Sequence, residues 1–189
     1  PFLPAGTVIA REQTYVHTFY KKEATAQQPA TSKEEGNLVA FSGPDFKATF
    51  DKQSGLLTSY LYKKHEYILN GQGPRPFFWR APTDNDYGAN LPVRLKAWKE
   101  ASYQEPKAES FQVTPGSNAT TVKVTYRFPQ TEARWNITYK IYASGVIKVD
   151  NRFMAEGDQA PMIPRVGLRM QLPESFTDLT YYGRGPKEN

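Results

Sequence analysis

The segment from Arg80 to Gly88 concentrates side chains whose types and spacing are suited to chemistry. Two carboxylates, Asp84 and Asp86, stand two residues apart, so on an extended chain they would share one face. Paired carboxylates are what general acid and base catalysis uses. We favour a simpler interpretation, in which Asp84 and Asn85 form local turn hydrogen bonds and Arg80 pairs with a carboxylate.

The composition argues against a metal site or a cysteine- or histidine-based active site. The chain has no Cys and only two His, which excludes thiolate zinc sites and disulfides and makes a His-rich site improbable. The order Asp84-Asn85-Asp86, followed by Gly88, is similar to the start of a calcium loop. The acidic residue that such a loop needs at its last position would fall at Leu95. We therefore expect no metal and no cofactor.

The charge pattern bears on possible partners. The net charge is +5, from 24 basic and 19 acidic residues that are interspersed along the chain. The densest basic stretch, Lys63-Lys64-His65, is too short to follow a phosphate backbone, so we expect no nucleic acid partner. No apolar run approaches the roughly 20 residues of a membrane span, so we expect no membrane partner.

On both sides of the polar segment, alternating apolar and polar residues predict antiparallel strands, each with one buried and one solvent-exposed face. Strands are expected at residues 7–18, 46–51, 57–62, 66–69, 121–128, 133–141, 146–154 and 166–172. One short helix is expected after the polar segment. Asn90 would cap it, Pro92 suits its first turn, and Leu91, Leu95 and Trp98 would share one face.

These elements predict an all-β fold, a large antiparallel β-sandwich with one short helix inserted. Residues 21–36 have no hydrophobic face and are predicted to be a linker. Residues 1–20 would then end a preceding domain, and residues 37–189 would form the sandwich. The chain starts at Pro1 without an initiator Met or signal peptide, and its end is turn-like, so we expect it to derive from a longer polypeptide.

Three separated stretches resemble the β-galactosidase small-chain region of glycoside hydrolase family 2. Residues 78–88 are similar to its RAPTDND-x-G signature, residues 50–57 to its F-D-x-x-S-G-x-L turn, and residues 182–189 to its G-x-G-P-x-E-N element. Residues 5–13 also resemble the last strand of the immunoglobulin-like domain that precedes this region in the family. The residues of the last turn motif are Gly183, Gly185, Pro186, Glu188 and Asn189.

The resemblance implies a partial supersandwich domain, with a fold like that of galactose mutarotases. In the family, two glutamates on a separate (β/α)8 barrel cleave terminal β-D-galactosides with retention, so no catalytic residue is carried over to this chain. We expect a non-catalytic domain, inactive alone, that braces the barrel. Its partners would be the rest of the same polypeptide, namely that barrel and the immunoglobulin-like domains, and a β-galactoside sugar is a candidate ligand. Arg80, Asp84, Asn85 and Asp86 would form a substrate-rim or interdomain loop.

Two other functions remain open from the sequence. A free-standing carbohydrate-binding module would use tyrosines such as Tyr60 and Tyr62 as stacking platforms, although these side chains could equally pair across strands. A mutarotase-type enzyme with the same fold would need a Glu and a His on inner strands. His17 and His65 both lie outside the strongest predicted strands, which disfavours that enzyme.

Overall fold

A computed structural model describes residue 4, residues 29–157 and residues 162–180 of the chain. Several sequence-based predictions lie outside the described residues. They are the strand at residues 7–18, residues 21–28 of the linker, and the turn motif Gly183, Gly185, Pro186, Glu188 and Asn189.

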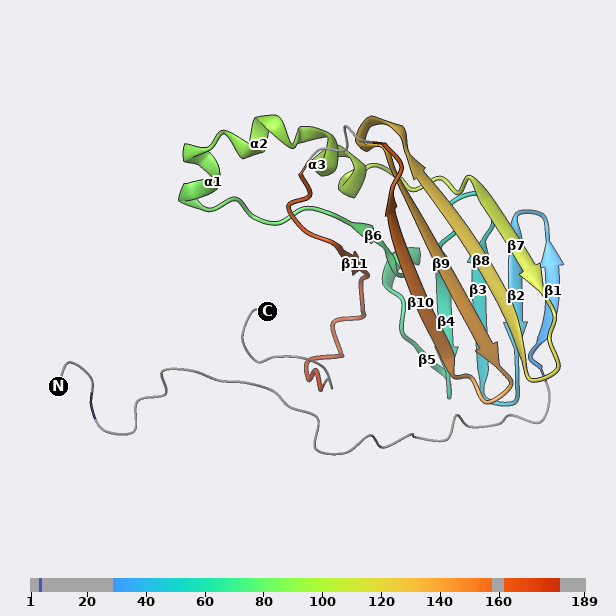
Figure 1. Ribbon diagram of the computed structural model, residues 1–189. Coiled ribbons are helices and arrows are strands. Elements are labelled where there is room, and N and C mark those ends of the chain that lie inside the picture. The colour runs from blue at the N-terminus through green and yellow to red at the C-terminus, as the bar shows by residue number, and fades with distance from the viewer. Residues whose placement is uncertain (1–3, 5–28, 158–161, 181–189) are drawn as a thin grey trace.

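Two antiparallel sheets make up the body of the molecule (Figure 1). The first has five strands in the order β1-β2-β3-β4-β5. They are β1 (Thr31–Glu35), β2 (Leu38–Ser42), β3 (Phe46–Asp51), β4 (Leu57–Tyr62) and β5 (His65–Glu66). The second sheet has four strands in the order β10-β9-β8-β7. They are β7 (Ser110–Thr114), β8 (Ala119–Phe128), β9 (Ala133–Tyr142) and β10 (Ile147–Ala155).

A two-stranded ribbon and a group of helices complete the described fold. The ribbon pairs β6 (Arg75–Phe77) with β11 (Gly167–Arg169). Between β6 and β7 lie α1 (Asp84–Gly88), α2 (Leu91–Arg94) and α3 (Lys96–Tyr103). Two 3-10 turns, η1 (Leu69–Gly71) and η2 (Pro129–Thr131), connect strands.

The core lies between the two sheets because their strands alternate as the sequence predicts. Phe46, Ala48 and Phe50 on β3 are buried, whereas the residues between them are more exposed. On the opposite sheet, β9 buries every second residue, including Tyr139. The rings of Phe50 and Tyr139 meet edge to face with centroids 5.0 Å apart, which joins the sheets. The predicted all-β antiparallel sandwich is thus confirmed.

Gly55 shows how closely the sheets approach one another. It follows β3 in a turn with φ of +76°, a conformation that glycine adopts without strain. A Cβ atom at this position would stand 2.5 Å from Val124 Cγ1 and 2.6 Å from Tyr126 Oη on β8. Both the backbone angle and the lack of space therefore require glycine.

The predicted single helix is wrong, because three short helices occupy this region. Leu95 and Trp98 are buried as expected, but Leu95 has φ −107° and ψ 19°, which interrupts the helix between α2 and α3. Asn90 stands at the N-cap position of α2 in a left-handed conformation, and its side chain makes no capping hydrogen bond. The apolar spacing therefore predicted the buried face but not the break.

Several strand predictions also need correction. The strand expected at residues 66–69 is only the two-residue β5, after which the chain turns into η1. The strand expected at 166–172 shrinks to β11. The centre of β10, an edge strand of its sheet in the described part of the chain, is exposed on both faces and so lacks the predicted buried face. Residues 31–35, within the predicted linker, form the edge strand β1, whose five residues are all exposed and therefore show no apolar alternation.

Candidate functional site

The polar segment that follows β6 is anchored at its base by a buried aromatic residue. Phe78 is fully buried, and its ring centroid lies 4.8 Å from that of Trp98 on α3. Its backbone N–H donates to Ser102 Oγ at 2.9 Å, and the Ser102 hydroxyl donates in turn to Trp98 O at 2.7 Å. The start of the segment is thereby fixed to α3, so the chain beyond it leaves the sandwich from a defined point.

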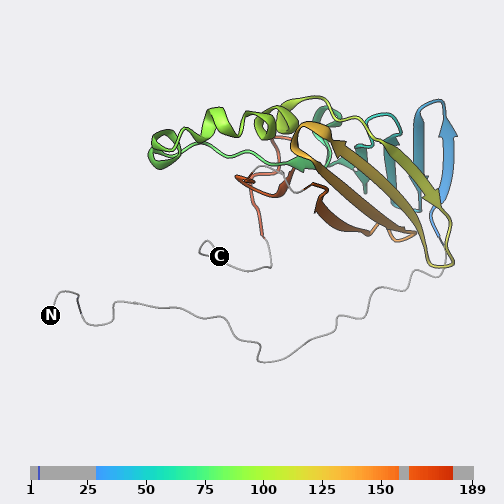
Figure 2. The same cartoon turned by 45° about the horizontal axis from the view of Figure 1, so that its top comes forward.

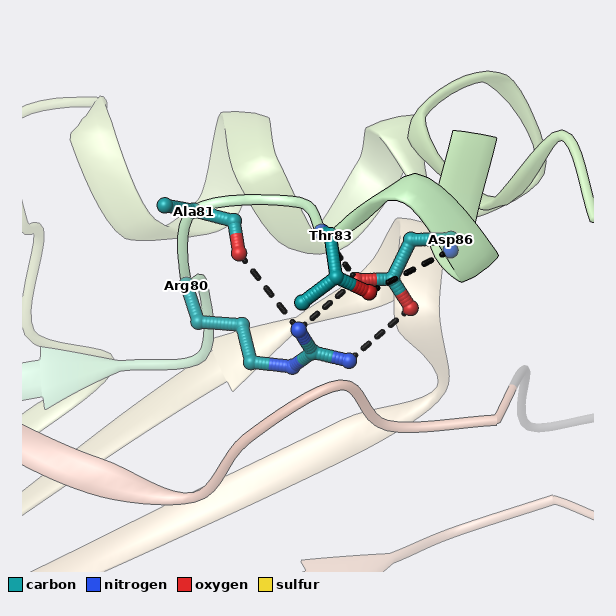
Figure 3. A network of polar contacts seen from close by, with 4 residues as sticks. All are labelled: Arg80, Ala81, Thr83 and Asp86. Carbon is teal, nitrogen blue, oxygen red and sulfur yellow. Dashed lines mark hydrogen bonds and ion pairs between the residues drawn. The ribbon is translucent and has the colours of Figure 1, made fainter. Parts of the chain in front are cut away.

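Arg80 and Asp86 form a bidentate ion pair across the segment (Figure 3). Arg80 Nη1 lies 2.7 Å from Asp86 Oδ2, and Nη2 donates to Oδ1 at 2.9 Å. Two parallel contacts of this kind fix orientation as well as contributing energy. Arg80 Nη1 also lies 3.4 Å from the carbonyl oxygen of Ala81. The expected pairing of Arg80 with a carboxylate is therefore present, and Asp86 is that carboxylate.

Thr83 and Asp86 also form a capping box at the start of α1. The Thr83 hydroxyl accepts from the Asp86 backbone N–H at 3.4 Å, and Asp86 Oδ2 accepts from the Thr83 backbone N–H at 2.8 Å. These reciprocal bonds satisfy N–H groups that have no partner inside the helix. The local hydrogen bonds assigned to Asp84 and Asn85 are thus made by Thr83 and Asp86 instead.

The electrostatics of Asp86 suit a structural carboxylate. The backbone N–H of Thr83 lowers the pKa of Asp86 most, and the Arg80 and Thr83 side chains lower it further, against a smaller opposing effect of burial. Asp86 is therefore ionised at neutral pH. A general acid needs a raised pKa instead, and Asp86 is committed to its contacts with Arg80 and Thr83. Asp84 and Asn85 are exposed at the start of α1. The two aspartates do not form a paired acid and base.

A small pocket lies beside this ion pair. It holds about 230 Å³ of empty space and has mostly apolar walls. Its lining comprises Trp79, Arg80, Pro82, Asp86, Leu91, Pro92, Leu95 and Pro164. Reasoning from the sequence missed Thr83, Trp79 and Pro164. The threonine three residues before an acidic residue was the available signal for the cap, whereas nothing local in the sequence connects Pro164 with this segment.

The tyrosines considered as sugar platforms are engaged within the fold. Tyr60 and Tyr62 stack on each other on β4, with ring centroids 6.4 Å apart. The Tyr60 hydroxyl donates to Gly145 O at 2.6 Å and so links the first sheet to the turn between β9 and β10. Both rings are half-buried, so they present little free face to a ligand.

Among the described residues, no three His, Cys, Asp or Glu side chains gather closely enough to hold a metal ion. No helix in the same part of the chain has the length and apolarity to cross a membrane.

The fold and site define a class of protein, an antiparallel β-sandwich domain with a helical arm, α1 and α2. The ion pair between Arg80 and Asp86 holds the start of this arm in place. Comparison with known proteins gives the family. A family model described as "Beta galactosidase small chain" matches residues 42–189. The chain belongs to the β-galactosidase small-chain family, and the resemblance inferred from the sequence is confirmed.

Individual relatives agree with this assignment. A β-galactosidase from Priestia megaterium is 33% identical over 165 residues, covering 87% of this chain and 16% of the relative. A β-galactosidase from Clostridium acetobutylicum is 34% identical over 152 residues, covering 80% of this chain and 16% of the relative. A β-galactosidase small subunit from Latilactobacillus sakei is 29% identical over 167 residues, covering 77% of this chain and 51% of the relative. The chain therefore spans 16% of the length of the first two relatives and about half of the small subunit.

Proposed function

We propose that this chain is a non-catalytic domain of a larger β-galactosidase, which hydrolyses terminal β-D-galactosides with retention. In that enzyme it braces the catalytic barrel, and its helical arm, α1 and α2, shapes the rim of the active site or an interdomain contact. The observation that carries this proposal is the arm itself. It projects beyond the edge of the sheets (Figure 2), and it bears two exposed apolar residues, Tyr87 (63% exposed) and Val93 (67% exposed).

The chemistry of the arm supports a role in shape and contact. Arg80 and Asp86 satisfy each other, so they hold α1 in place without a free acid or base. An arm fixed at both its base and its tip presents apolar side chains in a defined position, as a contact between domains requires. The curated relatives, which are named β-galactosidases and are several times longer, also support the presence of further domains.

The first test is the activity of the chain alone. We expect the purified 189-residue chain to show no hydrolysis of o-nitrophenyl β-D-galactoside above the uncatalysed rate. Measurable turnover that survives repeated purification would overturn the non-catalytic assignment.

The second test concerns the arm within the full-length polypeptide. Val93→Ser removes an exposed apolar side chain from α2. We expect kcat/KM to fall about fivefold, which is the loss typical of truncating a moderately important interface residue. The matched control is Val146→Ser, an exposed valine in the turn between β9 and β10, at the far end of the sandwich from the arm. Equal activities of the two variants would show that the arm makes no functional contact.

A further inference from the structure

A second pocket lies away from the arm, where the β6–β11 ribbon meets the end of α3. It spans about 340 Å³ of space that is partly open to solvent, and its walls are more polar than those of the pocket beside the arm. Two arginines, Arg75 and Arg169, line it together with the side chains of Gln72, Tyr103 and Gln171. No aspartate or glutamate is among the described residues that line it. The pocket therefore combines two positive charges with neutral hydrogen-bonding groups.

The two arginines are brought together by the register of the ribbon. Arg75 on β6 stands directly opposite Arg169 on β11, and both side chains reach the same pocket. Like charges directly opposite one another on paired strands are destabilising. The described residues supply no ion pair to either guanidinium within 4.0 Å, and Glu105 acts on Arg75 only from a greater distance.

Each guanidinium is held in place by uncharged groups. Arg75 is only 8% exposed, and its Nη2 donates to the carbonyl oxygens of Ser102 and Gln104 at the end of α3. Its Nη1 faces Gln72, with Oε1 at 3.3 Å. Arg169 lies against two aromatic rings, with its Cζ 5.5 Å from the centroid of Phe77.

Arg169 also lies 5.8 Å from the ring centroid of Tyr103, and that ring packs edge to face on Phe77. This contact with two rings orients the guanidinium without using its N–H donors. Within the described part of the chain, no hydrogen bond engages those donors. Burial lowers the pKa of Arg75 most, and the nearby Arg169 lowers it further, against the opposing effect of Glu105 outside the pocket.

We propose that this pocket binds a small oxyanion, a phosphate or an organic carboxylate, between Arg75 and Arg169. Planar guanidinium groups match the geometry of both anions and form charge-assisted hydrogen bonds with them. Gln171 and Tyr103, which also line the pocket, carry further hydrogen-bond donors. The bound anion would relieve the repulsion across the ribbon, so anion binding would also stabilise the pairing of β11 with β6.

Calorimetric titration of the complete chain with inorganic phosphate and, separately, with citrate tests the proposal. Sodium chloride at matched ionic strength serves as the control for screening. We expect saturable heat from at least one oxyanion, and a rise in melting temperature in the same buffer. The ligand that binds more tightly shows whether the pocket prefers a phosphate or an organic carboxylate. Stabilisation by chloride equal to that by the oxyanions, or no heat and no melting shift with either oxyanion, would overturn the proposal.

A variant locates the site. Arg169→Gln removes an exposed guanidinium that contributes no described backbone hydrogen bond through its side chain, so the fold should persist, and we expect affinity to fall at least about tenfold. Arg75 is less suitable, because it holds the end of α3. The matched control is Arg152→Gln, an exposed arginine on β10 outside the pocket, which should leave affinity unchanged. Equal affinities of the Arg169 variant and the wild type would also overturn the proposal.

Discussion

Glu66 and Tyr126 show two opposite outcomes for a polar side chain placed against this core. Glu66 Oε1 accepts from the backbone N–H groups of Tyr60 and Ile68, both at 2.8 Å, and Oε2 accepts from Ser59 Oγ. Tyr126 is 1% exposed, and its hydroxyl has no hydrogen-bond partner among the described residues. A charged group with several donors stabilises the fold, whereas a buried hydroxyl without a partner costs free energy.

Tyr126→Phe is expected to raise the free energy of unfolding by roughly 1 kcal/mol, because it removes a buried hydroxyl and keeps the ring in place. Denaturant titration of both proteins measures the difference. Tyr139→Phe is the matched control, since the Tyr139 hydroxyl lies 3.5 Å from Pro74 O and its removal brings no such gain. A destabilised Tyr126→Phe protein would mean that the hydroxyl has a partner in solution.

Glu66→Gln is expected to lower stability at pH 7 by about 1–2 kcal/mol, because it replaces charge-assisted hydrogen bonds with weaker ones. Partial burial acts to raise the pKa of Glu66, but the hydrogen bonds from Ser59 and the backbone outweigh it and lower the pKa. A lowered pKa means that the stabilisation is complete above the unfolded value of about 4.3 and is lost as the pH falls through the lower folded value.

The measurement for Glu66 is denaturant unfolding of wild type and variant at several pH values from 7 down to 3. The difference between them should shrink as the pH falls below the unfolded pKa and through the lower folded pKa, because the wild-type carboxylate then becomes protonated. Glu100→Gln provides the control, because among the described residues Glu100 pairs with Lys96 alone, in an exposed contact at 3.3 Å, and such pairs contribute little. A difference that stays constant with pH would contradict the role assigned to the Glu66 charge.

At the scale of elements, α1 depends on its cap, because a helix of five residues cannot be stable by propensity alone. Thr83→Ala should weaken α1 by about 1 kcal/mol, and Thr83→Ser, which keeps the hydroxyl, should restore it. Amide hydrogen exchange is the suitable measurement. Faster exchange is expected within 84–88 and no change in β8 and β9. Equal loss of protection throughout the sandwich would show that the arm and the sheets unfold as one unit.

The elements also show what the sequence could predict. The sequence predicts β3, β8 and β9 closely, because each has one face on the core and its alternation is therefore visible. It predicts β4 from the turn after β3, since the burial of β4 does not alternate. The edge strand β1 was missed because no face of it is buried. Alternation of apolar and polar residues therefore appears only in strands that bury one face. It reveals those strands, but it does not reveal an exposed strand that is paired at the edge of a sheet.

The candidate site was predicted only in part, for a related reason. The sequence predicts that Arg80 pairs with a carboxylate. Which of the two nearby aspartates accepts the ion pair depends on the backbone of α1. The pairing of Arg75 with Arg169 lies beyond local patterns, because 94 positions separate them and only the register of the ribbon makes them neighbours. Long-range register follows from packing, which no local motif encodes.

At the scale of the whole molecule, Phe78 connects the helices to the second sheet. Its ring lies within 6 Å, centroid to centroid, of four other aromatic rings from α3 and from the strands or strand ends of the second sheet. They belong to Trp98, Phe128, Trp135 and Phe153. Phe153 is one of the few half-buried residues of the otherwise exposed β10. The edge strand and the helices therefore share one aromatic cluster.

Phe78→Ala should destabilise the whole sandwich by about 3–5 kcal/mol, because it leaves a cavity where α3 meets β8, β9 and β10. Phe111→Ala is the matched control, since Phe111 is only half-buried and its ring meets that of Phe50 at 6.1 Å. Thermal unfolding followed by near-ultraviolet circular dichroism, which reports on aromatic packing, should show a much larger fall in melting temperature for Phe78→Ala. If the two variants melted alike, the cluster would not couple α3 to the second sheet, and the sandwich would not fix the position of that helix.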